Sequence, residues 1–196
     1  MLRIRSMAQY RAPWLALAIA FASVVAHAEG RAPINRYAVK VPACDFRAGG
    51  ARTTVNAPAA TVRALVQDYG HYSEFIKPFE ASKIVGREGD KTDVYLRIKI
   101  LKGAAKIWAV VRFEPPVGGG ENETVNAKML KGNVKRLDAT WHLRAVDEGH
   151  TEVSLEILMV PDFPAPEALV VPEVRDAAAT ALDGLRNEAE MRSSEK

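Results

Sequence analysis

The side chains that could do chemistry in this chain are few and far apart. Beyond residue 28 there are three histidines, His71, His142 and His150, and each falls in a different predicted element. That spread gives no metal-ligand spacing. We expect His71 at the surface or at the mouth of an interior space, and His142 as a solvated partner of a carboxylate on a neighbouring strand.

Signals for nucleophilic and phosphate chemistry are equally weak. Ser73 and Ser154 lack the Gly-x-Ser-x-Gly turn that exposes a catalytic serine. Cys44 stands alone, so it predicts a small buried hydrophobe rather than a disulfide partner, with a reactive or interchain thiol as the alternative. The triplet Gly118-Gly119-Gly120 follows two prolines and has no helix start or lysine behind it, which predicts a flexible hairpin loop. We predict no catalytic residue, no metal site and no cofactor.

The elements that would have to position any functional group are five successive strands between Asp93 and Val160. Apolar residues recur along them at every second position, the spacing that puts side chains on one face of a strand. These inward sets are Val94, Leu96, Ile98 and Ile100; Ile107, Ala109, Val111 and Phe113; Val125, Ala127 and Met129; Leu137, Ala139, Trp141 and Leu143; and Val153, Leu155, Ile157 and Met159. They contain no ionisable side chain, and the Trp141 indole N–H is their one polar group, which needs a partner when buried.

The opposite face of the same strands is charged. Basic residues stand there around Arg97 and Arg112, and acidic ones include Asp138, Glu152 and Glu156. We expect cross-strand pairs between them to neutralise this face. A docking face for an acidic partner or an anionic lipid is the alternative.

The first 28 residues predict a signal peptide. Arg3, Arg5 and Arg11 precede an apolar run from Pro13 to Ala26, and Ala26-His27-Ala28 supplies a small-x-small cleavage pattern. The apolar run of about 14 residues is short for a spanning helix, which needs about 20. We therefore expect export to the periplasm or beyond, with an uncleaved membrane anchor as the alternative.

Removal of this segment changes the charge of the protein. The full chain has a net charge of +3, and the three surplus arginines all lie within residues 1–28. The remainder carries as many basic as acidic side chains. A basic nucleic-acid footprint is therefore absent, and we expect no nucleic-acid partner.

The order of predicted elements is strand, helix, short helix, meander and long helix. A strand is expected at residues 52–56, a helix from Pro58 to about Gly70, and a second short helix at Tyr72 to Ile76. Six strands joined by tight turns follow, so with the first strand the antiparallel sheet has about seven. The last helix is expected from Pro172 to about Met191, because proline disrupts a helix interior. We interpret residues 29–50 as an N-terminal extension with a possible edge strand and Gly49-Gly50 as a joint, and residues 51–193 as the domain.

The segment from Ala59 to Val85 resembles the opening of a known family. A helix is followed by a Tyr-x-x-Phe-aliphatic-x-Pro pattern at Tyr72, Phe75, Ile76 and Pro78, and then by the strand start Lys83-Ile84-Val85. This sequence pattern is similar to that of the START-like (SRPBCC) polyketide cyclase/dehydrase family, which includes coenzyme Q-binding proteins. Together with the Pro-containing entry into the last helix, the resemblance covers roughly residues 50–192.

The resemblance implies an α+β helix-grip fold, in which a curved antiparallel sheet wraps a long C-terminal helix and a cavity lies between them. Such cavities hold a lipid, sterol, quinone or polyketide-like molecule. The expected ligand-binding residues are Tyr72, Phe75, Leu96, Ile98, Ile107, Ala109, Val111, Val125, Ala127, Met129, Ala139, Trp141, Leu155, Ile157, Val174, Ala178, Ala181, Leu182 and Leu185.

Three functions are compatible with this reading. The uncharged inner face favours an exported carrier or binding protein for an apolar small molecule or lipid, which would meet a membrane only transiently. A cyclase or aromatase would need an ionisable group at the cavity. A closed-core interaction module would result if the bulky Phe113, Met129 and Trp141 side chains fill the space. The ligand and the oligomeric state are not specified by these patterns.

Overall fold

The computed structural model describes residues 31–100, 105–119 and 121–195, and Ala32–Lys196 form one compact unit. The predicted signal peptide lies outside the described residues. The strands are β1 (Asn35–Val39), β2 (Ala48–Val55), β3 (Phe79–Glu88), β4 (Lys91–Ile100), β5 (Ala105–Phe113), β6 (Val117–Gly119), β7 (Asn122–Gly132), β8 (Arg136–Ala145) and β9 (Thr151–Val160). The helices are α1 (Ala59–Val66), α2 (Tyr72–Phe75) and α3 (Glu167–Ser194).

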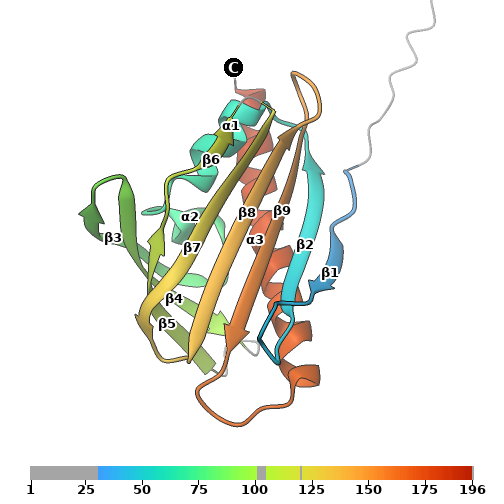
Figure 1. The fold of residues 1–196 in the computed structure, drawn as a ribbon. Coiled ribbons are helices and arrows are strands. Elements are labelled where there is room, and N and C mark those ends of the chain that lie inside the picture. Colours follow the sequence, from blue (N-terminus) through green and yellow to red (C-terminus); the bar gives the residue numbers. More distant parts are fainter. Residues whose placement is uncertain (1–30, 101–104, 120, 196) are drawn as a thin grey trace, which may run out of the picture. The chain divides into compact units, whose positions relative to one another are not determined.

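One antiparallel sheet contains all nine of these strands. The strand order is β1-β2-β9-β8-β7-β5-β4-β3, and the short β6 pairs with β7. Apart from the short β6, each strand from β3 to β9 is hydrogen-bonded to the next one along the chain, as tight connections require. The α+β helix-grip prediction is confirmed (Figure 1), β1 is the possible edge strand expected within residues 29–50, and β6 is an additional short strand. The Gly118-Gly119 pair therefore belongs to a strand, not wholly to a loop.

The diglycine at 49–50 lies inside β2, so the prediction of a joint there is wrong. A Cβ atom at Gly49 would lie 2.7 Å from the backbone nitrogen of Arg175, and one at Gly50 would meet the Tyr37 ring at 2.5 Å. Glycine inside a strand often marks a close backbone approach of this kind. The two glycines let α3 and the edge strand β1 pack closely on β2. The compact unit accordingly begins at Ala32, ahead of residue 51.

The long helix α3 packs on the concave face of the sheet, and in Figure 1 it runs behind β8, β9 and β2. It begins at Glu167, before the expected start, and continues through Pro172. The proline removes one backbone hydrogen bond from the second turn. Val170, Val171 and Val174 are buried around it, and their burial offsets that loss.

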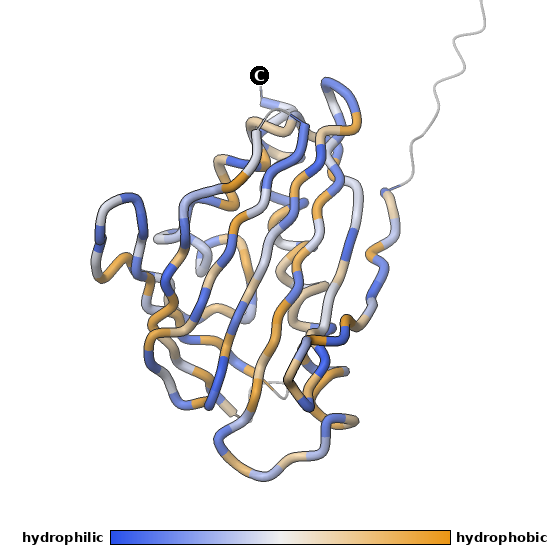
Figure 2. The backbone as a smooth tube through the Cα atoms, viewed as in Figure 1, coloured by the Kyte–Doolittle hydropathy of each residue, from blue (hydrophilic) through white to orange (hydrophobic). Residues whose placement is uncertain are grey.

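The core lies between this helix and the inward face of the strands. The expected inward sets are buried or half-buried, and the apolar stripe of α3 is buried against them. Figure 2 shows apolar and polar segments alternating along the strands, as a sheet with one dry face requires. The period-two pattern therefore assigned the two faces of the sheet correctly.

Candidate functional site

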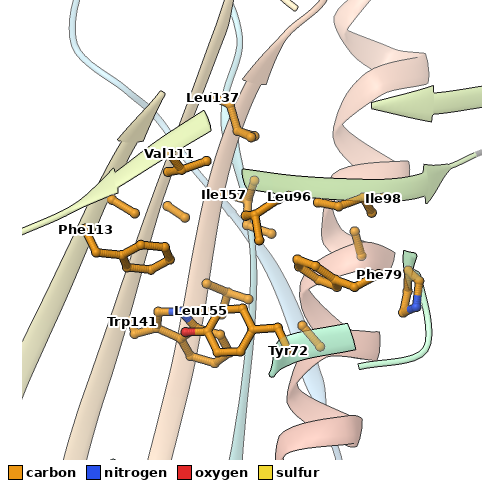
Figure 3. Close-up of a pocket in the computed structure, with 15 residues that line it drawn as sticks. Tyr72, Phe79, Leu96, Ile98, Val111, Phe113, Leu137, Trp141, Leu155 and Ile157 are labelled. Carbon is orange, nitrogen blue, oxygen red and sulfur yellow. The ribbon is translucent and has the colours of Figure 1, made fainter. Parts of the chain in front are cut away.

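A small apolar cavity lies between the sheet and α3, beside the α2–β3 junction (Figure 3). Its volume is about 80 Å³. Fifteen residues line it: Tyr72, Pro78, Phe79, Leu96, Ile98, Val111, Phe113, Ala127, Leu137, Ala139, Trp141, Leu155, Ile157, Ala177 and Ala181. None of them carries a charge, so the cavity is suited to hydrocarbon.

The predicted ligand-binding residues divide into two groups. Ten of them line the cavity: Tyr72, Leu96, Ile98, Val111, Ala127, Ala139, Trp141, Leu155, Ile157 and Ala181. The others pack elsewhere in the core or at its edge, namely Phe75, Ile107, Ala109, Val125, Met129, Val174, Ala178, Leu182 and Leu185. The alternation of apolar residues identifies the inward face of each strand, but it does not indicate which part of the strand's length lines the cavity.

Five lining residues were absent from that predicted set. Phe113 and Leu137 belong to the inward sets, and Pro78 belongs to the aromatic segment before β3. Phe79 opens β3, where a register shift follows it, and Ala177 lies on α3 next to the predicted Ala178. The alternating apolar pattern could have indicated Phe113 and Leu137, and the Tyr72–Pro78 pattern could have indicated Pro78. The bulge at Phe79 and the rotation of the helix could not be derived from spacing.

Tyr72 is the hub of an aromatic cluster that closes one side of the cavity. Its ring makes edge-to-face contacts with Phe75, Phe79 and Phe113, at centroid distances of 5.8, 5.9 and 6.2 Å. The ring also lies 6.5 Å from Trp141. Such pairs add to the stabilisation that burial alone provides. The cluster is therefore a packed wall, and it leaves only part of the space between sheet and helix open.

The polar atoms of this wall are satisfied within the protein. The Tyr72 hydroxyl donates a hydrogen bond to the Val66 carbonyl oxygen. Burial raises the pKa of the Tyr72 phenol well above its ordinary value, and a hydrogen bond with the Trp141 side chain acts in the opposite direction. Tyr72 is neutral at ordinary pH and provides no general base.

One ionisable group on the inward face was missed by the sequence analysis. Glu123 stands two residues before Val125 on β7, and only 6% of its side chain is exposed. It accepts hydrogen bonds from Arg63 and Gln67, the latter at 3.1 Å. Arg63 and Gln67 are four residues apart on one side of α1, a spacing that could have indicated a shared partner. Glu123 ties α1 to the sheet and does not line the cavity.

The charged outer face is neutralised differently from the prediction around Arg97 and Arg112. Arg112 binds Asp93 at 2.7 Å and also contacts Glu88, and Arg97 binds Glu80 at 3.0 Å. These partners come from β3 and β4, the next two strands in the sheet from β5, whereas Asp138, Glu152 and Glu156 lie on β8 and β9. The carboxylates named in the prediction pair with other residues; Glu152, for example, forms an ion pair with Arg144 at 3.3 Å.

The histidines lie away from the cavity. His71 is exposed, and its hydrogen bond with Asp68 raises its pKa. His142 is exposed on β8 and meets the Thr124 hydroxyl at 3.2 Å, not a carboxylate. Cys44 is only half-buried. Within the described part of the chain, no group of histidine, cysteine and carboxylate side chains could hold a metal ion.

The sequence and the fold both match known proteins. The family model described as polyketide cyclase/dehydrase and lipid transport matches residues 55–186. The chain belongs to this family. Membership associates it with apolar-ligand binding or cyclase chemistry. Among curated protein sequences, none matches the chain.

Solved structures share the fold at low sequence identity. A STAR-related lipid transfer protein from Xanthomonas axonopodis is 16% identical, with a TM-score of 0.66 over 82% of this chain and 99% of that one. Human STARD10 is 11% identical, with a TM-score of 0.68 over 85% and 72% of the two chains. The Zhui aromatase/cyclase from Streptomyces sp. R1128 is 16% identical, with a TM-score of 0.62 over 73% and 93%. These similarities concern the fold alone. Among the helices that the structure describes, none is long and apolar enough to cross a membrane.

Proposed function

We propose that this protein binds the hydrocarbon part of an apolar ligand between the sheet and α3, and serves as an exported carrier for it. The observation that carries the proposal is the chemistry of the lining. All fifteen lining side chains are apolar or aromatic, and the polar atoms of Tyr72 and Trp141 are engaged with the protein. An alkyl or isoprenoid segment loses no hydrogen bond on entering such a space.

The same lining disfavours a substrate with many carbonyl groups. Each carbonyl moved from water into this cavity would find no donor there, at a cost of about 2 kcal/mol or more. A poly-β-keto chain would carry several such groups. A cyclase would also need an ionisable group at the reacting atoms, and Glu123 is held by Arg63 outside the lining. The binding function is therefore preferred over cyclase chemistry.

The size of the cavity limits how much of a ligand it holds. A group the size of a water molecule occupies about 10–15 Å³ of cavity volume. The cavity of about 80 Å³ therefore holds about six such groups. Six methylene groups contribute about 5 kcal/mol of transfer free energy before the costs of association. That value corresponds to weak binding on its own. We therefore expect a ligand whose alkyl end fills the cavity while the rest stays outside it.

The test is a binding measurement on delipidated protein. A dansyl-labelled undecanoic acid is displaced by unlabelled fatty acids, sterols and quinones, and organic extracts of the native protein are examined by mass spectrometry for bound lipid. Ala139→Phe places a phenyl ring in the cavity and should abolish displacement-sensitive fluorescence. Ala168→Phe, on the exposed start of α3, is the matched control and should bind as the wild type does.

The possible outcomes separate the three functions. Loss of binding in Ala139→Phe alone supports the carrier. A delipidated protein that binds no lipid, sterol or quinone would refute it and favour a closed core. Turnover of a poly-β-keto thioester, followed by chromatography of the cyclised product, would favour the enzyme.

A further inference from the structure

The outer face of the sheet carries an apolar surface away from the cavity. An open groove crosses β3, β4, β5 and β7 there, and Val85, Tyr95, Trp108, Val110 and Leu130 line it. Three of these side chains are well exposed: Val85 at 55%, Leu130 at 50% and Trp108 at 38%. A contiguous apolar surface with a large exposed aromatic is a common sign of an interaction site.

Basic side chains border this groove on one side. Lys99 on β4 stands directly opposite Lys106 on β5, and Arg97 stands opposite Trp108. Glu80 is the carboxylate that pairs with all three, at 3.0 Å from Arg97, 3.1 Å from Lys99 and 3.0 Å from Lys106. One negative charge therefore faces three positive ones. Like charges directly opposite each other destabilise a sheet, so this excess is kept at a cost.

The rest of the rim does not cancel the excess. Asp93 at the groove and Glu88 are both bound by Arg112, and Lys131 beside Leu130 balances the one negative charge that this group leaves, so the excess around Glu80 remains. Together the groove residues and Arg97, Lys99, Lys106 and Lys131 form what we call the basic–apolar face. Its chemistry is an apolar strip with an indole and a phenol, bordered by cations.

The backbone at Trp108 is held by Asn133, from the turn between β7 and β8. The side-chain carbonyl of Asn133 accepts a hydrogen bond from the Trp108 backbone N–H at 2.8 Å. The Asn133 backbone N–H donates to the Trp108 carbonyl at 3.1 Å, and its side-chain amide donates to the Lys106 carbonyl at 3.0 Å. These bonds hold the backbone from which the exposed indole projects beside the cations.

We propose that the basic–apolar face docks on the surface of an anionic phospholipid bilayer. Tryptophan and tyrosine rings favour the headgroup level of a membrane, and lysine and arginine at the same level meet lipid phosphates. An acidic polypeptide would match the cations, but it offers less to an open strip of valine, leucine and tryptophan. The face also shares β4 with the cavity, because Arg97 and Lys99 alternate with the lining residue Ile98. Docking would bring the ligand-holding end of the sheet to the membrane.

The experiment is sedimentation with vesicles of phosphatidylglycerol and phosphatidylcholine, and with pure phosphatidylcholine vesicles. Each protein is measured as the full chain and as residues 29–196, so that the apolar run at 13–26 is separated from the effect. Wild type should bind the anionic vesicles more tightly, and about 0.5 M salt should release it. Removing one lysine should weaken binding about fivefold, so Lys99→Gln with Lys106→Gln should weaken it about thirtyfold.

A control of equal charge change distinguishes a site from general electrostatics. Lys40→Gln with Arg192→Gln removes two exposed positive charges outside the face and should change binding less than twofold. In residues 29–196, which lack Trp14, phosphatidylcholine with brominated acyl chains mixed into the anionic vesicles should quench the emission of Trp108, and Trp108→Phe should remove that quenching. Trp141 is buried and should not respond.

Three results would overturn the proposal. The first is no preference for anionic vesicles in residues 29–196. The second is an equal loss of binding in the control double variant. The third is a Trp108 emission change with poly-glutamate but not with vesicles, which would assign the face to an acidic polypeptide. Fatty-acid displacement reports the cavity separately, so failure here leaves the proposed function standing, and the reverse also holds.

Discussion

Leu96→Ala should lengthen the alkyl chain that the cavity prefers. Leu96 lines the cavity from β4 and is buried. The substitution removes about three carbon atoms from a side chain that faces the cavity. In wild type, affinity should rise about fourfold for each added methylene, because each contributes about 0.8 kcal/mol. The rise should stop at about six carbons, where the cavity is full.

In the variant, the plateau should move to about nine carbons. Unfolding free energy should fall by about 2–5 kcal/mol, since a cavity replaces the leucine. Saturated fatty acids of increasing length, competing with the dansyl probe, give the plateau, and urea unfolding gives the stability. Leu143→Ala is the matched control, because Leu143 is equally buried on the inward face but does not line the cavity.

The control should lose similar stability without moving the plateau. A plateau that stays at the same length in Leu96→Ala would refute the assignment of the cavity as the binding site. A wild-type affinity that continues to rise beyond about twelve carbons would refute the size argument, and would mean that sheet and helix separate to admit the chain.

Three further predictions concern stability and titration. Arg186→Met should cost about 2 kcal/mol by urea unfolding, because Arg186 is 8% exposed and hydrogen-bonds Ala32 at 2.7 Å and Asp183 at 2.7 Å, whereas the exposed Arg192→Met should cost little. The hydrogen bonds from Arg112 lower the pKa of Asp93 in the folded protein. The pair therefore stabilises the fold above the pKa that Asp93 has in the unfolded chain, and this contribution is lost as the pH falls through the lower folded pKa. Asp93→Asn should flatten that part of the profile of unfolding free energy against pH. Burial raises the pKa of Tyr69 to about 12. The contribution of Tyr69 to stability is therefore complete below its unfolded pKa and is lost as the pH rises towards 12. In Tyr69→Phe, the titration of tyrosinate absorbance at 295 nm should lose a step near that pH. The Tyr69 ring is buried and stacks on Phe113 at a centroid distance of 4.1 Å, and a Tyr69 that titrates near 10 would contradict that burial.

Much of the architecture could be read from local patterns. The inward period along the strands, the tight turns and the stripe on the last helix each follow from side chains that must reach one core. These patterns were sufficient for the α+β fold and for ten of the fifteen cavity residues. They could not place the buried diglycine inside β2, because the close backbone approach that requires it depends on a helix more than a hundred residues further along the chain.

Local patterns alone are enough to predict a sheet with a mainly apolar inner face, covered by an alanine-rich helix. Hydrophobic periodicity alone dictates that outcome, because apolar side chains on one face must be buried. The amount of open space depends on packing in three dimensions, where the Tyr72 cluster walls one side of a cavity of about 80 Å³. The tertiary structure also decided which charges meet. Pairing of β3, β4 and β5 brings three cations to Glu80 beside an exposed tryptophan, a juxtaposition that arises only when the strands are in register.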